Sequence, residues 1–104
     1  MAIATIDSGI CGFVTRVTTT QTDDGSVKID IDSSCEHIRK AAEALNEVEP
    51  FNEISFYGGS IPTILQAQYG CPHAACPVFV GIIKAVEVAA GLALPKDVTI
   101  TIEQ

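Results

Sequence analysis

The chain has 104 residues and a mass of 11.0 kDa, which is the size of one domain with its own hydrophobic core. Hydrophobic residues make up 47% of the sequence and charged residues 18%, a balance that excludes intrinsic disorder. Six Lys and Arg stand against 13 Asp and Glu, and a formal charge of -7 repels nucleic-acid phosphates and anionic membranes.

The first third of the chain predicts three strands. Residues 2–6 and 13–20 are rich in Ile, Val and Thr, which are typical of strands. Asp23-Asp24-Gly25 predicts a hairpin turn, because Gly adopts the left-handed conformation that a bulged turn needs. Residues 27–32 then alternate between apolar and charged side chains, which indicates a strand with one buried face.

A first helix is predicted after the third strand. Ser33 can cap this helix while Glu36 reaches back, the arrangement of a capping box, and Pro50 ends the helix. The apolar residues that fall at helical spacing on one face are Ile38, Ala41, Ala42, Leu45 and Val48.

The second half of the chain predicts a loop at residues 51–59, a short helix at residues 60–70 and a third helix at residues 77–90. The third helix is apolar on nearly every side, which indicates a buried position. Residues 98–102 alternate strictly and predict a final strand. We therefore expect a single α+β domain over residues 1–104. In it, two or three helices pack on one face of a small, mostly antiparallel sheet of about four strands.

The predicted hairpin places two cysteines at one end of the sheet. If Thr22 pairs with Ser26 across the turn, counting outward along both strands puts Phe13 opposite Cys35. Cys11 then lies at the same end of the sheet as Cys35. Cys35 also falls in the first turn of a helix, where unpaired N–H groups and the helix dipole favour a thiolate.

The other two cysteines flank the start of the third helix. Pro77 suits the first helical position, which puts Cys76 at the N-cap of that helix. Cys71 lies five residues earlier, and His73 lies between the two cysteines. All four cysteines therefore fall at turns or helix starts.

The compartment bears on the chemistry of these thiols. No basic segment precedes the first apolar residues, so the sequence predicts no signal peptide. The most apolar segment, residues 78–90, is shorter than the ~20 residues that a membrane helix needs. We therefore expect a cytoplasmic protein with neither a membrane nor a nucleic-acid partner. In that compartment, cysteines are more often thiols or metal ligands than disulfides.

The first interpretation of the cysteines is a metal site formed by Cys11, Cys35, Cys71 and Cys76. Four thiolates match the ligand number of an all-cysteine zinc site or an iron–sulfur cluster, and His73 could replace one of them. The spacing is not diagnostic, because the only close pair has four intervening residues.

Two other interpretations stay open. In thiol redox chemistry, Cys35 or Cys76 would be the nucleophile, a second thiol would resolve it, and Arg16 or His37 would favour the thiolate. Alternatively, the cysteines are small buried core residues. The sequence contains no nucleotide-binding, metalloprotease or serine-hydrolase motif, so it assigns no enzyme class. The final strand could also be a sheet edge that pairs with a second copy of the chain, giving a homo-oligomer.

Several segments together resemble a known family. They are Gly9-Ile10-Cys11-Gly12-Phe13, Ser34-Cys35-Glu36, the run CPHAACPV at residues 71–78 and the run GLALPKDV at residues 91–98. The chain resembles a family of small, single-domain prokaryotic proteins with four cysteines, associated with anaerobes and of unknown function. The resemblance covers nearly the whole chain and implies that the four cysteines form one set. An anaerobic setting is compatible with an oxygen-sensitive cluster.

Overall fold

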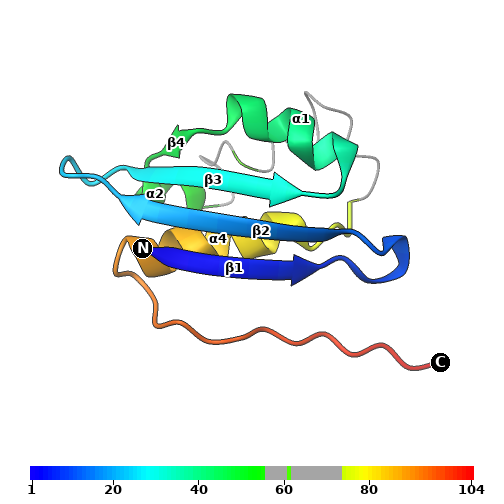
Figure 1. Ribbon diagram of the computed structural model, residues 1–104. Coiled ribbons are helices and arrows are strands. Elements are labelled where there is room, and N and C mark those ends of the chain that lie inside the picture. Colours follow the sequence, from blue (N-terminus) through cyan, green and yellow to red (C-terminus); the bar gives the residue numbers. More distant parts are fainter. Residues whose placement is uncertain (56–60, 62–73) are drawn as a thin grey trace.

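Four strands form one antiparallel sheet in the computed structural model, which describes residues 1–55, 61 and 74–104 (Figure 1). In sheet order the strands are β1 (Ala2–Asp7), β2 (Val14–Gln21), β3 (Val27–Ser33) and β4 (Glu47–Val48). The described helices are α1 (Glu36–Ala44), α2 (Pro50–Glu53) and α4 (Val78–Ala89), with a 3-10 turn η1 (Gly9–Cys11). This architecture confirms the predicted α+β fold class. None of the described helices is long and apolar enough to span a membrane.

The hairpin between β2 and β3 has the predicted turn and register. The N–H of Thr22 donates to the carbonyl of Ser26 at 2.8 Å, and Gly25 has a φ of +91°. The Asp24 carboxylate accepts hydrogen bonds from the Thr22 hydroxyl and the Ser26 N–H, and these bonds lower the pKa of Asp24. From this turn the pairing runs without a bulge to Thr15 opposite Ser33.

Helix α4 packs against β1 and β2 and runs antiparallel to β1, as two contacts show. Gly81 lies against Ile6, near the end of β1. One turn later, the carbonyl of Ala85 accepts a hydrogen bond of 2.8 Å from the hydroxyl of Thr19, and Thr19 pairs with Ala2 at the start of β1. The beginning of α4 therefore points toward the end of the sheet where β1 stops and β2 starts.

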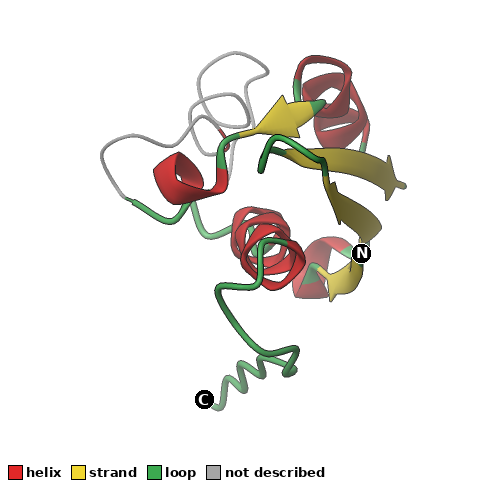
Figure 2. Ribbon diagram, turned by 90° about the vertical axis from the view of Figure 1, so that its left-hand side faces the viewer, coloured by secondary structure: helices red, strands yellow, loops and turns green. Residues whose placement is uncertain are grey.

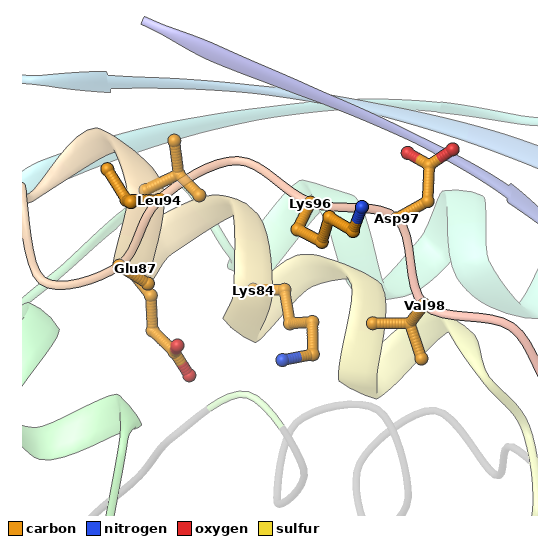
Figure 3. A pocket seen from close by; sticks show the side chains of 8 residues that line it. Lys84, Glu87, Leu94, Lys96, Asp97 and Val98 are labelled. Atoms are coloured by element: carbon orange, nitrogen blue, oxygen red, sulfur yellow. The ribbon is translucent and has the colours of Figure 1, made fainter.

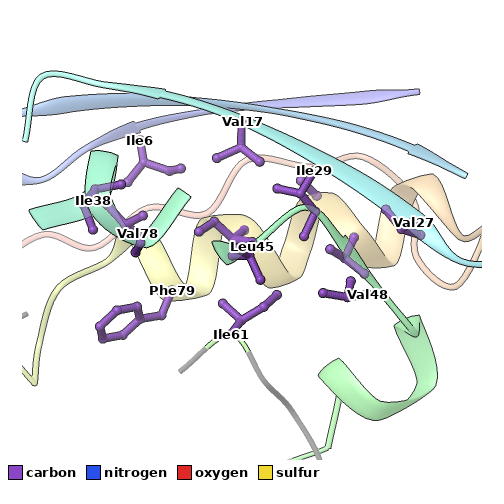
Figure 4. Packing of buried hydrophobic residues seen from close by; sticks show 14 residues of the cluster. Ile6, Val17, Val27, Ile29, Ile38, Leu45, Val48, Ile61, Val78 and Phe79 are labelled. Carbon is purple, nitrogen blue, oxygen red and sulfur yellow. The ribbon is translucent and has the colours of Figure 1, made fainter. Parts of the chain in front are cut away.

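One hydrophobic core joins the sheet to the helices (Figure 4). Its buried members are Ile6, Val17, Val27, Ile29, Ile38, Ala41, Leu45, Val48, Ile61, Val78, Phe79, Ile82, Ala85 and Val86. Each fully buried Ile, Leu or Val contributes about 1.5–3 kcal/mol relative to an exposed side chain. Because α1 and α4 share this core with the sheet, they cover the same face of it.

Helix α1 ends earlier than the sequence predicts. The predicted helix runs to Pro50, but Leu45 leaves the helical conformation at φ −109° and ψ 82°. The next carbonyl, that of Asn46, accepts the N–H of Ile29, and Val48 pairs with Val27. Val48 falls at helical spacing in the sequence, but its backbone pairs with β3 instead. The result is the short strand β4, which the sequence pattern does not predict.

The predicted loop at residues 51–59 contains one turn of helix. In α2, the carboxylate of Glu49 accepts the N–H of Phe51 at 3.4 Å, which caps a helix that Pro50 begins. Residues 56–59 of this loop, and the predicted helix at residues 60–70 apart from Ile61, lie outside the described residues. Ile61 is fully buried, and its N–H donates to the buried carboxylate of Glu53 at 2.9 Å.

The predicted final strand does not form. Among residues 1–55, 61 and 74–104, no strand pairs with residues 98–102, whose apolar side chains are 54% exposed at Val98, 74% at Ile100 and 90% at Ile102. Alternation of apolar and polar residues gives an extended segment one apolar and one polar face. A strand also needs a neighbouring backbone that pairs with its N–H and C=O groups. Within the described chain, this segment has no such neighbour.

Candidate functional site

The strand register brings Cys11 and Cys35 to one end of the sheet, as predicted. Beyond the pair of Thr15 and Ser33, the N–H of Ser34 donates to the carbonyl of Val14 at 3.2 Å. The N–H of Val14 donates in turn to the Ser34 hydroxyl at 3.1 Å. Cys35 follows Ser34 directly, and Phe13 precedes Val14. Cys11 lies two residues before Phe13, in the turn that joins β1 to β2.

The turn that carries Cys11 is closed by its own backbone. Gly9 and Gly12 flank it with φ values of +81° and +74°, and the N–H of Gly12 donates to the carbonyl of Gly9 at 2.9 Å. The Cys11 side chain is exposed. The apolar side chains of Ile10, Phe13 and Val14 beside it are also exposed, so this end of the sheet presents an apolar surface around a thiol.

Cys35 occupies the N-cap position of α1, with an extended backbone at φ −86° and ψ 124°. The sequence predicted Ser33 as the cap in a capping box with Glu36, and this prediction is wrong. Ser33 is still the last residue of β3, and its buried hydroxyl is hydrogen-bonded to that of Thr15 at 2.7 Å. The Ser33 hydroxyl also accepts the N–H of Cys35 at 3.1 Å, so a buried polar pair fixes the backbone where the cysteine leaves the sheet.

Arg39 is a further contributor that sequence reasoning missed. Its guanidinium Nη1 donates to the carbonyl of Ser33 at 3.3 Å and to that of Ser34 at 3.4 Å. The positive charge is therefore held beside the segment that leads into Cys35. The available signal is the spacing, because Arg39 lies four residues after Cys35 and hence one helical turn away.

Of the two basic residues that the sequence suggested for this role, Arg16 lies on the other face of the sheet and His37 lies in the first turn of α1, two residues after Cys35. Arg16 alternates with Thr15 and Val17, which are fully buried under α4, so its exposed side chain belongs to the opposite face of the sheet. Its neighbour across the strands is Asp32. His37 is exposed in the first turn of α1.

Cys76 reaches the same end of the sheet through α4. The helix begins at Val78 and its N-cap is Pro77, so Cys76 lies one residue before the cap, and the prediction that Cys76 is the N-cap is wrong. Cys76 stands five residues before Gly81, whose contact with Ile6 is near the end of β1. At a rise of about 1.5 Å per residue, those five residues carry the chain beyond Ile6 toward the turn that holds Cys11. Figure 1 shows the start of α4, the start of α1 and the β1–β2 turn at one end of the molecule.

Cys35 and Cys76 share an environment that differs from that of Cys11. Both are half-buried and pack against the hydrophobic core. The other two predicted ligands, Cys71 and His73, lie outside the described residues. Among the residues that are described, no group of three or more His, Cys, Asp or Glu side chains is close enough together to hold one metal ion.

Comparison with known proteins gives a family for the chain and nothing closer. No curated protein and no solved structure matches the sequence. The sequence profile of a family of unknown function, DUF6951, matches residues 2–102. This match spans the whole sheet, all the described helices and all four cysteines. The chain belongs to the DUF6951 family, a family of unknown function.

Proposed function

We propose that this protein binds a metal ion or an iron–sulfur cluster through Cys11, Cys35, Cys71 and Cys76. The observation that carries the proposal is that three cysteines, on three segments far apart in sequence, lie toward the same end of the sheet. Thiolates are the protein ligands of structural zinc and of iron–sulfur clusters, and four of them complete a tetrahedral set. Cys71 is the fourth candidate, and His73 is the alternative ligand.

The electrostatics around Cys35 support the binding of thiolates. A four-thiolate site concentrates negative charge in a protein whose formal charge is already -7. Cys35 sits at the N-terminus of α1, where the helix dipole is positive. The Arg39 guanidinium adds a fixed positive charge on the adjoining carbonyls. Both features offset the repulsion that the site would create.

The ligand set has one clear requirement. In the described part of the chain, Cys11, Cys35 and Cys76 are not close enough together to hold one ion, so a site that uses all four cysteines requires these three thiols to move together when the ion binds. The two histidines of the chain offer a matched pair of variants. His73→Ala tests a candidate ligand, and His37→Ala removes an exposed imidazole from the first turn of α1.

The experiment is a metal analysis of protein purified without oxygen, with an absorbance spectrum and a free-thiol count on the same sample. We expect about one zinc per chain, or iron with a broad absorbance near roughly 400 nm. Cys11→Ser and Cys71→Ser should each lower the metal content, while His37→Ala should leave it unchanged. Protein that holds no metal after reconstitution with zinc or with iron and sulfide, and that keeps four reactive thiols, would overturn the proposal.

Thiol redox chemistry is the second candidate, favoured by the placement of an exposed Cys11 near the N-cap thiol of Cys35. A peroxide would oxidise one thiolate to a sulfenic acid, and the second thiol would then displace water to form a disulfide. Peroxide titration of the metal-free protein, with mass spectrometry of the linked peptides, tests this. A Cys11–Cys35 disulfide would support the candidate function, and thiols that survive excess peroxide would refute it.

We infer that nucleic acids are not partners of this protein, since its charge of -7 opposes a phosphate backbone. A cytoplasmic location fits the proposal, because thiol ligands stay reduced there. Binding to a labelled duplex at low salt would contradict the first inference.

A further inference from the structure

The C-terminal segment, residues 98–102, has the sequence pattern of a strand but is not paired with any strand of the described chain. Val98, Ile100 and Ile102 alternate with Thr99 and Thr101, and exposure of the apolar side chains rises from 54% to 90% along the segment. The family profile extends to residue 102, so the segment belongs to the sequence that the family shares. An exposed row of β-branched apolar residues indicates a surface that a partner covers.

The exit from α4 directs this segment away from its own sheet. Gly91 has a φ of +75°, its N–H donates to the carbonyl of Val88 at 3.1 Å, and the N–H of Leu92 donates to that of Glu87 at 2.9 Å. These two bonds form a Schellman motif, which fixes the direction of the chain. Residues 93–98, which lead into the segment, pass over Lys84 and Glu87 and border an open hollow of about 150 Å³ (Figure 3).

The hollow lies on the face of α4 that points away from the core. Ile82, Ala85 and Val86 are buried against the sheet, whereas Lys84 is exposed. The sheet and the C-terminal segment consequently lie on different sides of α4 (Figure 2). The segment therefore does not reach the edge of its own sheet.

The same chain carries an open edge that such a strand fits. In the described part of the chain, no strand pairs with the outer side of β1, which is six residues long. The edge at the other side of the sheet, β4, is only two residues long. Natural edges are blunted by Pro, Lys or bulges, and β1 has none of these. Instead, Ile3 is 50% exposed on it.

We propose that residues 98–102 of one copy add to the β1 edge of a second copy, and that the exchange is reciprocal. Each chain has an unpaired strand-like segment, residues 98–102, and an unpaired sheet edge, β1, and the segment is one residue shorter than β1. In a two-fold dimer, the segment of each copy pairs with the β1 edge of the other, so no segment and no β1 edge stays unpaired. Backbone hydrogen bonds would supply the pairing, and the alternating apolar side chains would cover one face of the joint.

The test compares the wild type with Ile100→Pro and Ile100→Val under reducing conditions, so that no dimer arises from a disulfide. Pro removes a backbone donor in the middle of the strand, whereas Val keeps the donor and the β-branched shape. Because Ile100 is 74% exposed, neither change should affect the fold of a single chain. Light scattering should give twice 11.0 kDa for the wild type and for Ile100→Val, and half that mass for Ile100→Pro.

Hydrogen exchange identifies the occupant of the edge. We expect slow exchange of the amides of residues 98–102 and of β1 in the wild type, and loss of both protections in Ile100→Pro. A monomeric wild type with a protected segment would overturn the proposal in favour of pairing within one chain. A monomer with an unprotected segment would also overturn it, and so would a dimer that Ile100→Pro leaves intact.

Discussion

Gly81→Ala tests the contact that orients α4 on the sheet. In an ordinary helix interior, this change stabilises by about 1 kcal/mol, because Ala is the better helix former. Here the added Cβ would lie 2.5 Å from Cδ1 of Ile6 and closer still to its Cγ1, inside the 3.0 Å that real Cβ atoms keep. Overpacking a core typically costs about 1–3 kcal/mol, so we expect a net loss of about 1 kcal/mol. Urea unfolding followed by circular dichroism measures it.

The matched control is the same change in a background that opens the space. Ile6→Ala removes both side-chain atoms that the new Cβ would meet, at a cost of about 2–5 kcal/mol on its own. In that background, Gly81→Ala should become stabilising by up to about 1 kcal/mol, a reversal of sign. If Gly81→Ala stabilises the wild type, or if the sign is the same in both backgrounds, α4 does not lie against Ile6. The position inferred for Cys76 would then fail with it.

Three further changes test local features. Ser33→Ala leaves the Thr15 hydroxyl and the Cys35 N–H without their partner and should destabilise by about 1–3 kcal/mol in urea unfolding, and the added Thr15→Val should recover part of that loss. Asp24→Asn should lower the melting temperature at neutral pH but not at strongly acid pH. The turn hydrogen bonds lower the pKa of Asp24, so its stabilisation is complete above the unfolded pKa of about 3.9 and is lost as the pH falls through the folded value. In metal-free protein, Cys35→Ser should destabilise less than Cys35→Ala, because a Ser hydroxyl at the N-cap of α1 can accept an N–H of the first turn, whereas the same pair of changes at the exposed Cys11 should be nearly neutral.

Local chemistry explains which parts of the fold were predictable. The hairpin needs only a Gly at positive φ and two strands of matching pattern, so its register followed from the sequence to within one pair. The ends of α1 and the fate of residues 98–102 depend on distant partners instead. Val48 leaves a helical pattern because its backbone pairs with β3, whereas in the described part of the chain no strand pairs with residues 98–102. The pattern of apolar residues indicates which face of a segment can be buried. Whether that face is buried depends on the strands and helices that lie beside the segment in the fold.

The candidate site also contains one part that local sequence predicts and one part that depends on distant contacts. Cys11 and Cys35 are tied by the register of one hairpin, so their proximity could be deduced by counting residues. Cys76 is 41 residues beyond Cys35, and no local signal says which way its helix runs. That direction is set by Gly81 against Ile6 and by Thr19 beneath Ala85, two contacts between residues more than 60 positions apart. In the sequence, the direction of α4 is indicated by Gly81, a small residue on a helix that is apolar on nearly every side. Its role can be interpreted only when the strand that packs against it is known. The placement of Cys76 toward the end of the sheet that carries Cys11 and Cys35 is therefore a property of helix packing, and a change at Gly81 tests that placement.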